Sequence, residues 1–200
     1  MPNIFIISAP SGYGKTSLVR GISRSYNFLE LTISYTTRKM RRGEIDGKDY
    51  HFISPELFKN KVNKGEFIEH EAVYDNNYGT TYDSINDIVN LGKDALLEID
   101  YKGMIKIKKM IPNAISIYIL PPNLEELKNR LVERGLDAQD VINKRISKAE
   151  NELKYSRFSD FTIVNDNYNI ALSSLKSLIL HHKMIENSAI SRLNSYFESC

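Results

Sequence analysis

A glycine-rich turn near the start of the chain carries residue types that bind phosphate. It lies in the stretch IFIISAPSGYGKTSL, residues 4–18. Gly12 and Gly14 allow the backbone to coil so that successive N–H groups point at one phosphate group. Lys15 adds a positive charge for the β- and γ-phosphates, and Thr16 offers a hydroxyl ligand to Mg²⁺. The residues expected to hold the phosphates of a nucleotide are Ser11, Gly12, Tyr13, Gly14, Lys15, Thr16 and Ser17.

This turn departs from the eight-residue phosphate-loop pattern at one place, because Ala9 stands where the pattern has its first glycine. The alternative interpretation is a glycine-rich turn that merely joins a strand to a helix. The surroundings favour the phosphate loop. The apolar run at residues 4–7 predicts a buried strand before the turn, and a helical pattern begins near Ser17, so that the helix adds its positive end to the site.

Two charged segments follow strand-like stretches further along. Residues 95–100, ALLEID, predict a second buried strand that ends in Asp100. An acidic strand end of this kind pairs with a phosphate loop to hold Mg²⁺ through its waters. Residues 38–42, RKMRR, place four basic side chains in five positions. Taken alone, such a patch is most simply interpreted as a solvated turn.

Three arginines lie on predicted helices in the second half of the chain. Arg130 and Arg134 are one helical turn apart, and a surface ion pair with Glu126 is the plain explanation of Arg130. Arg145 instead falls within the apolar arc of its helix. A guanidinium in that position costs stability unless it meets an anion, so Arg145 is a candidate for the site.

The hydrophobic pattern predicts strands that alternate with helices. Strands are expected at 4–7, 31–35, 49–53, 67–73, 95–100, 115–120 and 161–164. Helices are expected at 17–26, 83–91, 102–110, from Ser54 and Asn123 onward, and in two segments over 170–197, with a hairpin turn at 46–47, a turn at 76–77 and a loop at 155–160. This order predicts a three-layer α/β fold with a parallel sheet. Because ligands bind at the carboxyl ends of such strands, residues 12–16, Ser34, Asp100 and Asn165 should meet at one edge.

Composition narrows the class of protein. Two hundred residues with 42% hydrophobic and 26% charged residues are ordinary for a globular domain, and a net charge of +2 is too weak to indicate nucleic acid or a membrane surface as a partner. The single Cys200 excludes an intramolecular disulfide and a cysteine-based zinc cluster. The short N-terminal apolar run without a basic leader indicates a strand and not a signal peptide. We therefore expect a cytoplasmic enzyme.

The assembled motifs resemble guanylate kinases. The resemblance runs over residues 4–180 and is carried by SAPSGYGKTS, ISYTTRKMRRGEIDGKDYHF, GEFIEHEAVYDNNYGTTYDSI, LLEIDYKG and PPNLEELKNRLVERG, with INKRI beyond. It implies a P-loop kinase core at about 1–33, 84–122 and 156–200 within one domain of 1–200. It also implies an inserted GMP-binding lobe at about 34–83 and a helical lid at about 123–155.

The resemblance also assigns roles to individual positions. Residues that match GMP-binding positions are Ser34, Arg38, Arg41, Tyr50, Glu69, Tyr78, Gly79, Thr80 and Asp100, of which Ser34, Glu69 and Thr80 match the guanine-reading ones. Residues that match catalytic positions are Lys15, Asp100, Arg130, Arg134 and Arg145. Asn165 matches a residue near the adenine of ATP, and Thr16 with Asp100, through water, matches the Mg²⁺ site. The chain departs from the family pattern at Glu98, usually Asp, and at Lys102, usually Gln.

The implied reaction transfers the γ-phosphoryl group of MgATP to GMP, and to dGMP, giving ADP and GDP in purine nucleotide metabolism. The implied partners are these small molecules and Mg²⁺, with no nucleic acid and no membrane, in a monomer or homo-oligomer. Two alternatives remain open. The first is a kinase for a sugar phosphate, which has no amide edge like that of guanine and so would not need Glu69 and Thr80. The second is a non-catalytic binding module, which would not need Gly14, Lys15 and Thr16.

Overall fold

A computed structural model describes residues 2–10, 14–73, 75–123, 125–126, 147 and 150–186. The core is a five-stranded parallel sheet. Its strands, in spatial order, are β2 (Leu29–Leu31), β7 (Asp94–Glu98), β1 (Ile4–Ser8), β8 (Ile115–Leu120) and β9 (Phe161–Val164). The predicted apolar runs form the central strands because a sheet covered on both faces needs near-continuous hydrophobic sequence.

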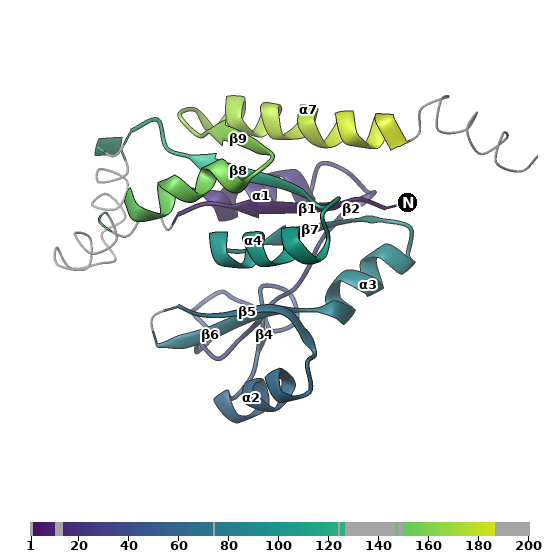
Figure 1. Cartoon of the computed structure of the whole chain (residues 1–200), viewed down its shortest axis with the longest axis vertical. Helices are drawn as coiled ribbons and strands as arrows, with labels where there is room; N and C mark the ends of the chain where they lie inside the picture. The colour runs from purple at the N-terminus through teal and green to yellow at the C-terminus, as the bar shows by residue number, and fades with distance from the viewer. Residues whose placement is uncertain are drawn as a thin grey trace, which may run out of the picture.

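Helices cover both faces of this sheet (Figure 1). On one face lie α1 (Lys15–Ser23) and α7 (Tyr168–Glu186), and on the other lie α3 (Tyr82–Asn90) and α4 (Tyr101–Met110). Successive residues of β1 point to opposite faces, so Phe5 and Ile7 pack with α1 and α7 whereas Ile6 packs with α3 and α4. The predicted three-layer parallel α/β fold is thus confirmed.

Residues 35–81 build a second, four-stranded sheet that lies beside α3 and α4 (Figure 1). Its strands, in spatial order, are β4 (His51–Phe52), β3 (Tyr35–Thr36), β6 (Asn76–Thr81) and β5 (Phe67–Val73). Helix α2 (Pro55–Asn63) packs on it through Phe58, whose ring stacks on Phe67 at a centroid distance of 4.5 Å. As predicted, Ser54 caps α2, since its side chain accepts a hydrogen bond from the N–H of Leu57.

The sequence expectations fail where strands are short. The single strand predicted at 31–35 is divided between the two sheets, as β2 and β3. The predicted hairpin at 46–47 is wrong, because β3 and β4 pair in parallel. The chain makes a turn there without forming two antiparallel strands.

Three local boundaries also differ. Helix α1 begins at the phosphate loop and ends at Ser23 instead of running to residue 26, and β6 already begins at Asn76, where a turn was expected. The predicted loop at 155–160 contains a 3₁₀ helix, η1 (Lys154–Phe158). Asn123 does cap a helix start, because its Oδ1 accepts from the N–H of Glu126 at 2.7 Å. Among the helices of the described ranges, none is long and apolar enough to cross a membrane.

Candidate active site

A cavity of about 370 Å³ lies where the carboxyl ends of β1 and β7 face β5 and β6. The core contributes the predicted residues Gly14, Lys15, Thr16, Ser17 and Asp100. The second sheet and its connections contribute Ser34, Arg41, Tyr50, Glu69, Tyr78 and Gly79. Residues from distant parts of the sequence therefore converge at the sheet edge where ligands of α/β folds bind.

The phosphate loop ends at Gly14, which is the N-cap of α1 and has φ 75°. A side chain would be strained at this left-handed φ. A Cβ at Gly14 would also lie 2.6 Å from Nδ2 of Asn165. Asn165 thus packs directly against the loop from the end of β9, as its place after a strand predicts, although it does not line the cavity.

Lys15 and Thr16 are oriented by the end of β7. Nζ of Lys15 donates to the carbonyl oxygen of Ile99 at 3.1 Å and lies 3.8 Å from Oε1 of Glu98. The hydroxyl of Thr16 donates to the same carboxylate oxygen at 2.6 Å. The Glu98 side chain, one methylene longer than Asp, therefore still reaches both residues of the loop.

Asp100 has a structural contact in addition to its place in the cavity. Its Oδ1 accepts from the N–H of Gly103 at 2.9 Å and so caps α4. Hydroxyl and carboxylate oxygens are the donors that Mg²⁺ prefers. Thr16, Glu98 and Asp100, which all line the cavity, thus form an oxygen donor set that fits this ion.

Glu69 is a buried carboxylate at the β5 side of the cavity, with 5% of its surface exposed. The hydroxyl of Thr80 donates to its Oε1 at 2.8 Å. Ser34 lies 3.1 Å from that hydroxyl, and because a hydroxyl has one proton, Ser34 is the donor to Thr80. Burial is the main cause that raises the pKa of Glu69 to about 7, with the charge of Asp100 adding to it.

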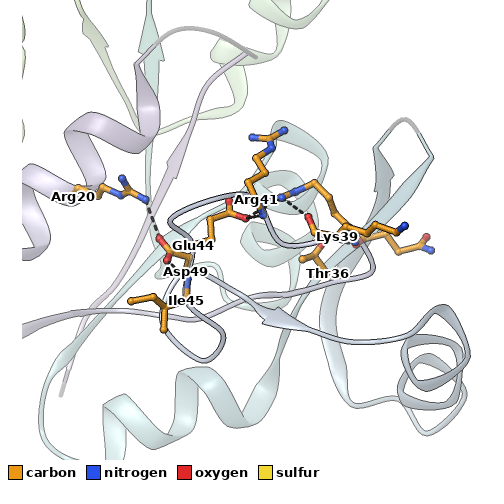
Figure 2. A network of polar contacts seen from close by, with 9 residues as sticks. Arg20, Thr36, Lys39, Arg41, Glu44, Ile45 and Asp49 are labelled. Carbon is orange, nitrogen blue, oxygen red and sulfur yellow. Dashed lines mark hydrogen bonds and ion pairs between the residues drawn. The ribbon is translucent and has the colours of Figure 1, made fainter. Parts of the chain in front are cut away.

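Two tyrosines and Arg41 form another wall of the cavity. The rings of Tyr50 and Tyr78 meet edge to face at 5.9 Å. Burial raises the pKa of Tyr50 to about 12, so this phenol stays protonated and can donate a hydrogen bond at neutral pH. Figure 2 shows the guanidinium of Arg41 pointing away from the loop that carries it. These groups suit an anion with several oxygens.

Arg38 does not line the cavity, unlike the other residues predicted to bind the GMP phosphate. Its guanidinium makes two hydrogen bonds to the carboxylate of Glu44, at 2.8 and 3.0 Å. Glu44 also accepts from the backbone N–H of Arg41 at 2.7 Å (Figure 2). In this structure, then, Arg38 organises the loop that presents Arg41.

The comparisons with known proteins identify the family. The model of the family described as guanylate kinase matches residues 1–182. The chain belongs to the guanylate kinase family. It is 44% identical over 181 residues to the guanylate kinase of Hydrogenovibrio crunogenus, which covers 90% of this chain and 88% of the relative. The guanylate kinase of Coxiella burnetii is 40% identical over 194 residues, 96% of this chain and 94% of the relative.

A solved structure supports the same assignment. The crystal structure of guanylate kinase from Anaplasma phagocytophilum matches with a TM-score of 0.73 and 30% sequence identity. The match covers 92% of this chain and 87% of that chain. The resemblance to guanylate kinases and the P-loop kinase fold expected from the motifs are thereby confirmed.

Some predicted positions fall outside the described residues. They are Ser11, Gly12 and Tyr13 of the phosphate loop and the three arginines Arg130, Arg134 and Arg145. Thr80 is fully buried and does not line the cavity. Its contact with the site is the hydrogen bond that it donates to the carboxylate of Glu69.

Sequence reasoning missed two acidic residues that line the cavity, Glu71 and Glu152. Glu71 could have been found, because it lies two positions after Glu69 and a strand points alternate side chains to one face. Lys102, a departure from the family pattern without an evident consequence in the sequence, forms an ion pair with Glu71. The sequence context of Glu152 gives no signal of a place in the site.

Proposed function

We propose that this guanylate kinase transfers the γ-phosphoryl group of ATP to GMP through the cavity described above, with dGMP as a second acceptor and the cytoplasm as its compartment. One observation carries the proposal. A buried carboxylate, Glu69, lies at one side of the cavity, and the lysine of the phosphate loop, Lys15, lies at another. A group suited to bind a base and a group suited to bind phosphate thus line the same cavity.

Glu69 reads guanine. The base presents its N1–H and 2-amino group side by side, and one carboxylate can accept from both. Adenine has an acceptor lone pair at N1, which would face the carboxylate unpaired. Sites built in this way reject the analogue by about 10⁴-fold. Ser34 and Thr80 hold the carboxylate in register through their chain of hydroxyls.

Arg41, Tyr50 and Tyr78 bind the phosphate of GMP. A guanidinium and two phenol hydroxyls offer donors to its oxygens, and the guanidinium also offsets its negative charge. Arg38 keeps the loop that carries Arg41 in place through Glu44. The acceptor phosphate is thereby held between the guanine-reading strand and the phosphate loop.

The chemical step requires no protein nucleophile, because an oxygen of the GMP phosphate attacks the γ-phosphorus of ATP and ADP leaves. The protein positions the reactants and offsets the negative charge that spreads over the transferred group. Lys15 lies where it can do this, and Arg130, Arg134 and Arg145 supply further cations. We assign these arginines to a lid at about 123–155 that closes with a GMP-binding lobe at about 34–83 and excludes water.

Thr16 would hold Mg²⁺ directly, and Asp100 would hold it through water, while Glu98 accepts a hydrogen bond from the Thr16 hydroxyl and so orients it. When bound with ATP, the ion offsets charge on the β- and γ-phosphates. Phosphate oxygens and water would supply its other ligands, as is usual for this ion.

The experiment that tests the proposal compares acceptors. The parent and Glu69→Gln are assayed by ADP release with GMP, dGMP, AMP, CMP and a sugar phosphate. Glutamine keeps the size but loses the charge and one acceptor position. We expect kcat/KM for GMP to fall by about 10²-fold in the variant, since hydrogen bonds to a charged group contribute about 1.5–3 kcal/mol each. The rate with AMP should stay low, so the GMP-to-AMP ratio narrows.

Glu56→Gln is the matched control, because Glu56 is an exposed acid on α2, which packs on the same sheet. It should leave all acceptor rates unchanged. A Glu69→Gln enzyme that discriminates GMP from AMP as well as the parent does would refute the assignment of Glu69. A parent enzyme that prefers the sugar phosphate would refute GMP as the acceptor.

A further inference from the structure

The first turn of α4 contacts β5 through two consecutive residues. Lys102 donates from Nζ to Oε1 of Glu71, and the two form an ion pair. The next residue, Gly103, lies so close to Glu69 that a Cβ there would be 2.9 Å from Oε2 of that carboxylate. Glycine is therefore needed where Glu69 packs against the helix. One helical turn thus contacts both carboxylates that β5 presents to the cavity.

These two carboxylates lie close to a third. Glu69 and Glu71 share a face of β5, and Asp100 lines the same cavity. Like charges at short range repel and disfavour ionisation. The ammonium of Lys102 offsets the charge of Glu71, whereas Glu69 accepts a hydrogen bond from the neutral hydroxyl of Thr80. Lys102 therefore lowers the repulsion between the carboxylates of this cavity.

The ion pair also joins two separate parts of the fold. Helix α4 covers the core sheet, whereas β5 belongs to the second sheet, and Figure 1 shows α4 between the two sheets. A contact between α4 and β5 sets how far the guanine-reading strand lies from the phosphate loop. The residue two positions before α4 contacts that loop, because the carbonyl oxygen of Ile99 accepts from Nζ of Lys15 at 3.1 Å.

We propose that Lys102 and Glu71 are positioning residues for the acceptor nucleotide, because their ion pair holds β5 against α4 and so sets Glu69 at the depth where it meets guanine. The inference rests on the proposed reading of guanine by Glu69. It adds that a residue pair which contacts neither guanine nor any reacting atom affects how tightly the acceptor nucleotide binds.

The size of the effect follows from exposure. The side chains of Lys102 and Glu71 are 50% and 30% exposed, so solvent screens the pair. Such pairs contribute up to about 1 kcal/mol, a change of about fivefold in an equilibrium constant. We therefore expect the effect in KM for GMP, with little change in kcat, in KM for ATP or in the melting temperature.

The test is a charge swap. The intact enzyme is compared with Lys102→Glu, Glu71→Lys and the double variant, with KM for GMP, KM for ATP, kcat and melting temperature measured for each. Each single variant places like charges together and should raise KM for GMP by about five- to tenfold, with KM for ATP within about twofold. The double variant rebuilds the pair in reverse and should return KM for GMP to within about twofold of the parent.

Glu71→Lys separates this proposal from simple attraction of an anionic substrate. Attraction predicts a lower KM for GMP, because a cation is added to the cavity wall, whereas a broken ion pair predicts a higher one. Lys109→Glu makes the same charge change as Lys102→Glu on an exposed residue of the same helix and should leave KM for GMP unchanged.

Three results would overturn the inference: a lower KM in Glu71→Lys, a double variant no better than its singles, or parallel losses of kcat and melting temperature that indicate general damage. None of these bears on Glu69 itself, whose role fails only if Glu69→Gln keeps the parent's discrimination between GMP and AMP. The two proposals can therefore fail separately.

Discussion

Glu69 and Thr80 lie opposite each other on β5 and β6 and are joined by a hydrogen bond of 2.8 Å between Oγ1 of Thr80 and Oε1 of Glu69. The pairing of these strands shifts register between Phe67 and Glu69. A shift of this kind is a β-bulge, which bends a strand and re-aims the side chain that follows. The bulge thus helps to turn Glu69 and its hydroxyl partner toward the cavity.

Thr80→Val tests the value of that hydrogen bond. Valine has nearly the same shape but no hydroxyl, so Glu69 stays buried and loses a donor. We expect kcat/KM for GMP to fall by about tenfold or more, because a hydrogen bond to a charged group contributes about 1.5 kcal/mol at the lower end of its range. Thr162→Val, the same change at an exposed position of β9, is the control and should have no effect. Equal activity in the two variants would show that the hydroxyl does not support Glu69.

The raised pKa of Glu69 predicts a pH dependence. The ionised carboxylate accepts from guanine, and its pKa in the free enzyme is about 7. Below that pH the carboxyl is protonated, so kcat/KM for GMP should fall by about tenfold per unit as the pH decreases, and it should level off above about pH 8. Glu69→Gln retains every other ionisation, including that of the GMP phosphate, and should lose this inflection. If the inflection persists in Glu69→Gln, the group that titrates is not Glu69.

The strands of the core sheet could be predicted from the sequence because burial on both faces imposes a strong local pattern. Residues 4–7, 95–97 and 115–120 are runs of apolar residues interrupted only by Ser116, and each lies in a strand of the core. The short strands β3 and β4 were expected only as parts of longer strands at 31–35 and 49–53. Their bounds follow from pairing, since β4 pairs with β3 and β3 pairs with β6, which is a long-range property that local sequence does not encode.

The site shows the same division. Gly14, Lys15 and Thr16 are close in sequence, and their spacing predicts the phosphate loop directly. The ion pair of Lys102 with Glu71 joins residues 31 positions apart, so neither residue predicts the other. Arg38 was expected to bind phosphate from its charge and its place in a family motif, but only the structure shows that Glu44 holds its guanidinium.

Lys15→Met tests the phosphate loop. The substitution removes the ammonium near the transferred group and keeps a long apolar side chain, so we expect kcat to fall by about 10³-fold or more. Lys15 and Glu98 are both about 20% exposed, and folding should change little. Circular dichroism and the melting temperature check the fold, and Lys109→Met serves as an exposed control. A variant that keeps more than about a tenth of the parent kcat, a loss below about 1.4 kcal/mol, would exclude Lys15 from the chemical step.

Glu44→Gln tests whether Arg38 acts through its loop. Glu44 holds two guanidinium nitrogens of Arg38 and the backbone N–H of Arg41, and the hydrogen bond to Arg38 is the main cause that lowers the pKa of Glu44. Glutamine is neutral, and its side chain has one acceptor oxygen where glutamate has two, so it cannot accept all three hydrogen bonds. The loop that presents Arg41 should therefore lose order. We expect KM for GMP to rise by about tenfold with kcat nearly constant, because a bidentate ion pair that is only partly exposed contributes more than an ordinary surface pair.

The direction of that change distinguishes two roles of Glu44. If Arg38 leaves Glu44 to bind the phosphate of GMP, the carboxylate competes with the substrate, and Glu44→Gln should lower KM for GMP instead of raising it. Arg38→Lys separates the cases further, since lysine keeps the charge but cannot form the two-pronged contact. With Glu44 as a support for the loop, Arg38→Lys and Glu44→Gln raise KM for GMP by similar factors, and the double variant adds little to either, because both changes break the same contact.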